Sequence, residues 1–268
     1  MTIDETFVLL RRRKEMALIA YVMGGYPTLK ESLEHAATML ECGADILEIG
    51  VPFSDPMADG PTIQHASQEA LGHGVTLRDI LFAVRSISVP QPIVLMSYLN
   101  PLLAYGRERL FQDMRYAGIS GLVVPDLPLE EAHGWSSCTD ATEANLICLV
   151  APTSTDERIR AIVRQSSGFL YCVSLTGTTG ARNELGPAVD DLLVRVRGIT
   201  DIPLAVGFGI SSPSHIRALR GNAEGVVVGS RIIDAIRRGE DLPRLVKTLK
   251  EATRSGTDVD SDANEREH

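Results

Sequence analysis

The chain has 268 residues, which is enough to bury a large hydrophobic core, and it carries a formal net charge of -9 at pH 7. This acidity argues against a general surface for nucleic acids or anionic membranes, although a local phosphate site built from backbone donors needs no net positive charge. The cysteines form no CxxC pair, which indicates a reducing, cytoplasmic setting. We expect no export signal, because the apolar run at residues 17–22 is short and lacks a cleavage pattern.

Eight strand-like runs follow one another along the chain, most of them separated by helical patterns. The first, at residues 17–22, is apolar throughout, as in strands covered on both faces. A helix is predicted after it, because Thr28 and Glu31 have capping-box spacing. The other runs lie at residues 45–49, 92–96, 121–124, 146–150, 169–173, 203–206 and 225–228. Eight strands alternating with helices over about 250 residues predict an α/β fold, a single (β/α)8 TIM barrel.

The barrel is predicted to occupy residues 1–252 as one catalytic domain, since nothing resembles a linker before residue 253. Residues 253–268 are rich in Asp, Glu and Ser, and they predict a disordered acidic tail. A doubly wound open sheet is the competing architecture, but no GxGxxG fingerprint follows the first strand. In a barrel the loops after the strands form one face, where the following residues can converge: Glu48, Asp59, Tyr98, Asp126, Tyr171 and Gly209.

The chain is organised around residues 46–64. This stretch begins as an apolar strand and places Glu48 among hydrophobic neighbours, where a carboxylate loses hydration unless something compensates. Prolines and Gly60 then disfavour helix and sheet, so an ordered loop carrying Asp55 and Asp59 follows the strand. This arrangement is typical of a functional site. The alternative is that Glu48 is a buried ion-pair partner and the loop acids form turns.

Three late loops are rich in glycine, at residues 177–180, 207–211 and 229–230. Glycine lets backbone N–H groups approach an anion, and Ser211 and Ser230 lie where helices are predicted to begin, with dipoles that favour an anion. Each glycine alone is typical of a turn. Glycine clusters after the last three strands of a barrel favour a phosphate site.

The lysines lie outside the predicted strand ends on the loop face, which leaves no amine for a Schiff base; they are Lys14, Lys30, Lys247 and Lys250. The histidines show no tight metal-ligand spacing. Carboxylates and Tyr171 remain, which indicates acid–base catalysis on a phosphorylated small molecule.

Residues 48–64, with the segments 125–128, 179–180, 207–211 and 228–230, closely resemble the tryptophan synthase alpha chain family. The resemblance implies a (β/α)8 barrel lyase of tryptophan biosynthesis that cleaves indole-3-glycerol phosphate to indole and glyceraldehyde 3-phosphate. It implies no cofactor in this chain. It also implies an α2β2 complex with a beta chain that carries pyridoxal phosphate and receives the indole.

The resemblance further implies residue roles. Glu48 and Asp59 become the catalytic pair, with Tyr171 beside the glycerol hydroxyls. The implied substrate-binding residues are Tyr21, Met96, Tyr98, Asp126, Thr179, Gly180, Phe208, Gly209, Gly229 and Ser230, and no metal ligand is implied. Three positions depart from the family's usual proline, threonine and small residue without removing a catalytic group: Ala20, Met23 and Arg231.

The implied retro-aldol reaction delivers a proton to indole C3 and removes one from the adjacent hydroxyl. Desolvation is expected to raise the pKa of Glu48 above about 4.3, so that it can donate and then accept a proton. Asp59, on a more polar loop, is expected to stay ionised and to stabilise positive charge at the indole N–H.

Three rival functions remain open at this point. One is another phosphate-binding barrel, such as a sugar-phosphate isomerase or epimerase, although the motif at residues 48–64 counts against it. A second is a stand-alone indole-3-glycerol phosphate lyase. A third is a non-catalytic allosteric partner of a beta chain, against which the presence of Glu48 and Asp59 argues.

Overall fold

The computed structural model describes residues 1–87, 89–173, 187–207 and 209–254. In these residues nine parallel strands form one sheet in the order β5-β4-β3-β2-β1-β9-β8-β7-β6. Their bounds are β1 Ala17–Met23, β2 Ile46–Gly50, β3 Ile93–Met96, β4 Ile119–Val123, β5 Asn145–Ile147, β6 Leu149–Val150, β7 Leu170–Val173, β8 Leu204–Gly207 and β9 Gly225–Val228. Each of the eight predicted runs therefore forms strand, with ends displaced by at most two residues.

The predicted strand at residues 146–150 is divided into β5 and β6 at Cys148. β5 pairs only with β4, and β6 pairs only with β7, among the strands described. Only Cys148 separates the two pieces, and its carbonyl accepts a hydrogen bond from the Tyr171 N–H at 3.0 Å. Strands in a barrel are staggered, and one strand can therefore bond one neighbour with its first half and the other with its second. The two pieces make one barrel strand, which closes the ring and confirms the predicted (β/α)8 class.

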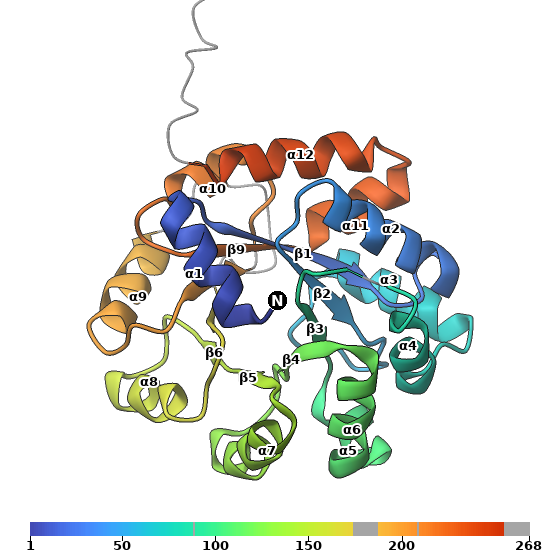
Figure 1. The fold of residues 1–268 in the computed structure, drawn as a ribbon, viewed down its shortest axis with the longest axis horizontal. Helices are drawn as coiled ribbons and strands as arrows, with labels where there is room; N and C mark the ends of the chain where they lie inside the picture. The colour runs from blue at the N-terminus through green and yellow to red at the C-terminus, as the bar shows by residue number, and fades with distance from the viewer. Residues whose placement is uncertain (88, 174–186, 208, 255–268) are drawn as a thin grey trace, which may run out of the picture.

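Helices surround the sheet in chain order, as Figure 1 shows. Their bounds are α1 Ile3–Arg13, α2 Leu29–Glu41, α3 Pro61–Gly72, α4 Leu77–Val84, α5 Leu99–Tyr105, α6 Arg107–Ala117, α7 Leu129–Thr142, α8 Asp156–Val163, α9 Pro187–Arg197, α10 Pro213–Ala218, α11 Ser230–Arg238 and α12 Leu242–Ala252. The predicted cap is present, since the Glu31 N–H donates to the Thr28 hydroxyl. Side-chain caps of this kind satisfy N–H groups that a first turn leaves unpaired.

The strand residues alternate between two hydrophobic clusters. In β1, Ile19 and Tyr21 belong to the cluster inside the barrel, whereas Leu18 and Ala20 belong to the cluster between the sheet and the helices. This alternation is the period of two of a strand. Ile46 at the start of β2 also belongs to the interior cluster, so Glu48, two residues later, points into the barrel.

Helix α1 closes the end of the barrel where the strands begin. Figure 1 shows it across this end, with the N-terminus near the centre of the ring. Its residues Ile3, Phe7 and Leu10 are buried and belong to the interior cluster. The opposite end, where the strands finish, is therefore the open end available to a ligand.

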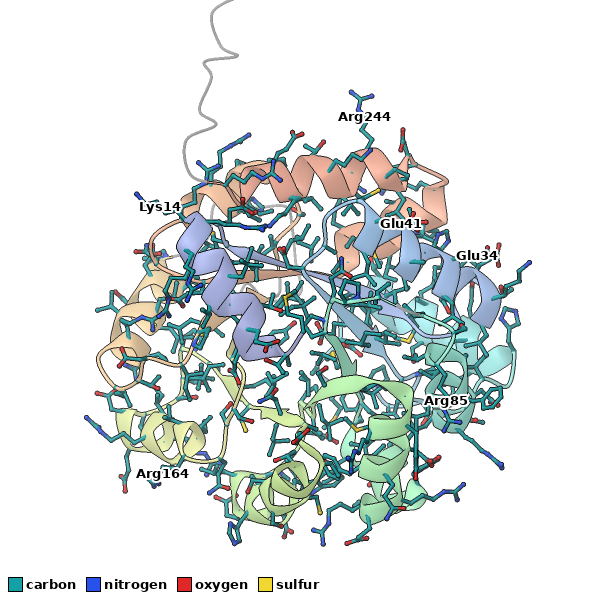
Figure 2. The ribbon with its side chains drawn as sticks, viewed as in Figure 1. Lys14, Glu34, Glu41, Arg85, Arg164 and Arg244 are labelled. Carbon is teal, nitrogen blue, oxygen red and sulfur yellow. The ribbon has the colours of Figure 1, made fainter. Side chains whose placement is uncertain are left out.

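Charged side chains such as Glu34, Arg164 and Arg244 point outward from the helices, as Figure 2 shows. No helix in the described ranges is long and apolar enough to cross a membrane. Thr253, predicted to begin the tail, is 1% exposed, and its carbonyl accepts a hydrogen bond from Met16 N–H. Contacts with the barrel therefore continue past residue 252, and we propose residue 254 as the end of the domain. The rest of the predicted tail, residues 255–268, lies outside the described residues.

Candidate active site

A cavity opens at the carboxyl ends of the strands. It is lined by Tyr21, Asp59, Ile63, Met96, Tyr171, Gly209, Val227, Gly229 and Ser230. Seven of these nine residues are site residues predicted from the sequence, contributed by strands and loops far apart in the chain. The barrel brings them together because every βα loop leaves the sheet at the same end.

Glu48 lies in β2, paired in register with Tyr21 of β1 and Val94 of β3. The residue is 1% exposed, and neither carboxylate oxygen has a hydrogen-bond partner among the described residues. Burial raises the pKa of Glu48 to about 8, and the nearby charge of Asp59 adds to this shift. The alternative in which Glu48 is a buried ion-pair partner is therefore not supported. At neutral pH this carboxyl group holds its proton most of the time.

Asp59 lies in the loop between β2 and α3 and is half-buried. Burial raises the pKa of Asp59 to about 6, while a hydrogen bond with the Tyr98 side chain lowers it. The environment is therefore less polar than the sequence predicted. A carboxyl group with this pKa is still mostly ionised at pH 7. The two acids therefore carry different protonation states at the same pH.

Tyr98 supports the Asp59 loop. Its hydroxyl oxygen accepts a hydrogen bond from Ala58 N–H at 2.9 Å, and its ring stacks on Phe53 with centroids 5.2 Å apart. Phe53 thus packs on its own barrel, whereas Met57 of the same loop is 86% exposed. Of these two apolar side chains of the loop, Met57 is therefore the one exposed to meet a partner surface.

Tyr171 points into the barrel from β7. A Cβ atom placed on Gly207 of the adjacent strand would lie 2.3 Å from the Tyr171 ring, so only glycine leaves room for it. Burial, with the charges of Glu48 and Asp59, raises the pKa of Tyr171 well above its usual value. The phenol therefore remains protonated and can donate a hydrogen bond in the cavity.

The predicted phosphate side is formed by the loops after β8 and β9. Gly209 has a φ of +80°, a conformation that side-chain-bearing residues rarely adopt. Gly229 is the N-cap residue of α11, and Ser230 is its first residue. This nine-residue helix begins at the cavity wall. The backbone N–H groups of its first turn can therefore bind an anion in the cavity.

Three of the predicted site residues that the structure describes are not in the cavity wall: Glu48, Tyr98 and Asp126. Asp126 accepts a hydrogen bond from Leu99 N–H at 2.8 Å and so caps the start of α5. Three predicted residues lie outside the described residues: Thr179, Gly180 and Phe208. Conversely, Ile63 and Val227 line the cavity and were not predicted. Val227 could have been found from the period of two in β9, while Ile63 carries no signal beyond its place in the first turn of α3.

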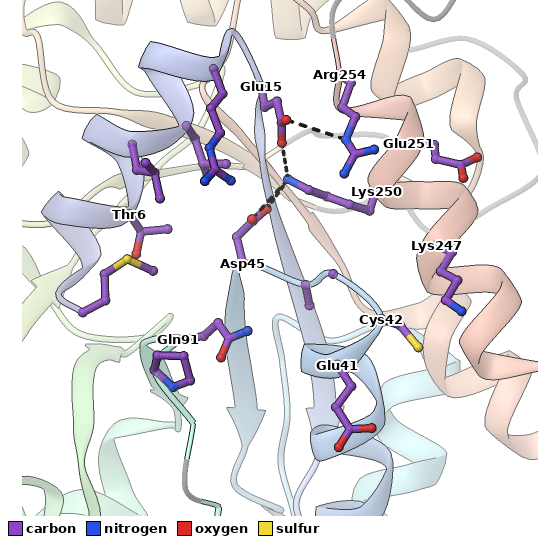
Figure 3. A pocket seen from close by; sticks show the side chains of 17 residues that line it. Thr6, Glu15, Glu41, Cys42, Asp45, Gln91, Lys247, Lys250, Glu251 and Arg254 are labelled. Carbon is purple, nitrogen blue, oxygen red and sulfur yellow. Dashed lines mark hydrogen bonds and ion pairs between the residues drawn. The ribbon is translucent and has the colours of Figure 1, made fainter.

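A second cavity, of about 480 Å³, lies at the closed end of the barrel beside α1 and α12 (Figure 3). In this cavity Lys250 forms two ion pairs, with Nζ 2.9 Å from Asp45 Oδ2 and 3.0 Å from Glu15 Oε2. Arg254 Nε lies 3.6 Å from the same Glu15 carboxylate. These four charges pair with one another, unlike the acids at the open end. In the parts of the chain that the structure describes, no group of three or more His, Cys, Asp or Glu side chains could hold a metal ion.

Comparisons with known proteins give one family. The sequence model described as "Tryptophan synthase alpha chain" matches residues 7–260. A relative of that name from Methanosarcina mazei is 46% identical over 255 residues, covering 95% of this chain and 93% of its own. One from Roseiflexus sp. is 49% identical over 254 residues, covering 92% and 97%. A solved structure of Mycobacterium tuberculosis tryptophan synthase has a TM-score of 0.90 at 40% identity, covering 95% of this chain and 98% of that chain.

Proposed function

This chain belongs to the tryptophan synthase alpha chain family, and on that premise we propose which residues carry out the family's reaction. The family cleaves indole-3-glycerol phosphate to indole and glyceraldehyde 3-phosphate in tryptophan biosynthesis, so the chain is a carbon–carbon lyase. An alpha chain needs no cofactor, because pyridoxal phosphate belongs to the beta chain with which it works. We further propose an α2β2 assembly and a cytoplasmic location.

Glu48 is the general acid of this proposal. It donates its proton to indole C3, the bond from C3 to the glycerol chain breaks, and the carbon that bears the adjacent hydroxyl becomes the aldehyde. The ionised Glu48 then accepts the proton that the hydroxyl releases, so that protons balance over the cycle. A buried carboxyl group with a pKa of about 8 suits both steps, because it is protonated at the start and basic enough afterwards.

Asp59 is the electrostatic partner. Protonation of C3 places positive charge on the indole ring, with its N–H as the point where a carboxylate can best accept a hydrogen bond. Asp59, with a pKa of about 6, is mostly ionised at neutral pH and can stabilise that charge. Tyr98 holds the loop that carries Asp59 through its contact with Ala58. Tyr171 supplies a hydroxyl to the glycerol chain.

Gly209, Gly229 and Ser230 are proposed to hold the phosphate at the start of α11. Tyr21 and Met96 form the wall of the indole pocket. The roles of Thr179, Gly180 and Phe208 rest on the family resemblance alone.

The observation that carries the proposal is a buried Glu48 without a hydrogen-bond partner in the described chain, beside a second acid at the open end of the barrel. The test is to incubate the purified chain with indole-3-glycerol phosphate and to measure indole, with and without a cognate beta chain. We expect slow release alone and a saturable rise with the beta chain. Absence of indole under both conditions would contradict the proposal and leave the non-catalytic partner.

The exposed Met57 provides the partner control. Met57→Asp places a charge where an apolar contact is expected, so it should suppress the rise caused by the beta chain while leaving the slow basal release. Phe82, which is 71% exposed on α4 and not part of this loop, gives the matched Phe82→Asp variant that should respond normally. Fast release that ignores the beta chain would instead favour a stand-alone lyase.

A further inference from the structure

Tyr21 has a place in the barrel that matches that of Tyr171. Tyr21 is in register with Glu48 of β2, and Gly50 lies two residues further along β2. Tyr171 is in register with Ala205 of β8, with Gly207 two residues further along that strand. In both pairs the tyrosine ring therefore leans over a glycine of the neighbouring strand, toward the open end.

The Gly50 contact is the closer of the two. A Cβ atom placed on Gly50 would lie 2.0 Å from the Tyr21 hydroxyl oxygen, so a larger residue would displace the phenol. At the other end of the side chain, a Cβ placed on Gly229 would lie 3.5 Å from the Tyr21 Cβ. The ring thus extends from the proposed phosphate loop to the strand that carries Glu48. A substrate that joins these two points must pass over it.

The Tyr21 hydroxyl has no hydrogen bond to any residue in the described part of the chain, and the side chain lines the cavity at 5% exposure. A tyrosine hydroxyl at a cavity wall can donate and accept hydrogen bonds, so a ligand in the cavity can use it. Burial, followed by the charges of Asp59 and Glu48, raises the pKa of Tyr21 well above its usual value. The hydroxyl therefore keeps its proton and can donate a hydrogen bond to a ligand in the cavity.

The two tyrosines flank the proposed phosphate site. In the sheet, β8 and β9 lie between β7 and β1, and the loops after β8 and β9 carry Gly209 and Gly229. A phosphate held there would have one phenol on each side of the carbon chain attached to it. The glycerol chain of the substrate bears two hydroxyl groups, which matches the number of phenols.

We propose that the Tyr21 hydroxyl binds a hydroxyl group on the glycerol chain of the substrate, opposite Tyr171, and thereby makes the site specific for a hydroxylated chain. This inference rests on the proposed function, because it uses the same cavity and substrate. It makes Tyr21 a specificity-determining residue whose polar atom contacts the ligand. The proposed apolar wall role of its ring remains.

The test compares two ligands and needs no turnover. Glycerol 3-phosphate and propyl phosphate differ only in the two hydroxyl groups, and their dissociation constants are measured by calorimetry for the wild type and Tyr21→Phe. We expect Tyr21→Phe to weaken glycerol 3-phosphate binding by about 3- to 10-fold, the value of one hydrogen bond, and to change propyl phosphate binding by less than about 2-fold. Equal changes for both ligands would overturn the inference.

Phenylalanine keeps the ring that packs beside Gly50 and Gly229, so Tyr21→Phe should fold, which a melting curve checks. Tyr26→Phe is the matched control, because Tyr26 is equally buried, at 3% exposure, but does not line this cavity. It should leave both dissociation constants unchanged. Indole release by the wild type separates the two hypotheses: if indole is released but Tyr21→Phe binds both ligands as the wild type does, only the Tyr21 inference fails.

Discussion

Asp45 and Glu48 are acids only three residues apart, just before and in the middle of β2, yet Asp45 has hydrogen-bond partners and Glu48 has none among the described residues. Asp45 accepts hydrogen bonds from Leu18 N–H at 2.8 Å and from Lys250 Nζ at 2.9 and 3.1 Å. Glu48, only three residues later, accepts none from the described residues. Glu48 is buried and Asp45 is partly buried, so the main difference between them lies in their partners.

This difference separates a stabilising region from a reactive one. At the closed end, Glu15, Asp45, Lys250 and Arg254 form what we call the floor cluster, in which α12 and the segment after α1 are tied to the start of β2. At the open end, Glu48 is left unpaired, which costs stability but leaves its proton available. Variants at the two ends should therefore change different properties.

The largest effect is expected from Glu48→Gln. Glutamine resembles the protonated carboxyl group in shape but cannot transfer the proton, so kcat should fall by roughly 10²- to 10⁴-fold. The melting temperature at pH 7 should be equal or higher, because Glu48 is largely protonated there already. Indole release and thermal melting measure the two quantities. Near-normal turnover would remove Glu48 from the mechanism.

Lys250→Met should have the opposite effect to Glu48→Gln: it should lower the stability of the fold and leave kcat unchanged. It removes the only lysine contact of Glu15 and Asp45 within the described residues. These two carboxylates are partly buried, with side chains 16% and 15% exposed, so the cost is up to about 3–5 kcal/mol in the free energy of unfolding. Denaturant unfolding measures this loss, and kcat of the folded fraction should be unchanged. Lys247→Met, on an exposed position of the same helix, is the matched control and should be nearly neutral. A comparable loss from both variants would show that the ion pairs are not the cause.

The pH dependence of stability should also differ between the two ends. The folded-state pKa of Glu48, about 8, lies above the ordinary value of 4.5, so the folded chain binds the extra proton between these values. Stability from this group is therefore lost as pH rises from about 5 to about 8, by up to about 1.4 kcal/mol per pH unit. Glu48→Gln should lack this part of the slope. Parallel stability curves for the wild type and Glu48→Gln would contradict the raised pKa.

The smallest effect is expected at the C-terminus. Ending the chain after Arg254 keeps the floor cluster and should change the free energy of unfolding by less than about 0.5 kcal/mol, because the acidic residues beyond it offer little surface to bury. Ending it after Ala252 also removes Thr253, whose carbonyl bonds Met16 N–H, and should cost clearly more. Equal melting temperatures for the two truncations would place the end of the barrel at residue 252 after all.

The sequence by itself determined the barrel, the burial of Glu48 and the glycine-rich loops of the open end. These features are local: apolar runs of strand length recur between helical patterns, and an acid inside such a run must be buried if the strand is. The common exit of the βα loops then places Asp59, Tyr171 and Gly209 near one another without any knowledge of individual contacts.

Only the tertiary structure decided which polar side chains have partners. Lys250 meets Asp45 across 205 residues of chain, and Asp126 caps α5 instead of lining the cavity. The division of one strand at Cys148 depends likewise on the stagger of its two neighbours. Such contacts depend on strand register and on helix packing between distant segments. Sequence periodicity gives the face on which a side chain lies, but it does not give the atom that the side chain meets there.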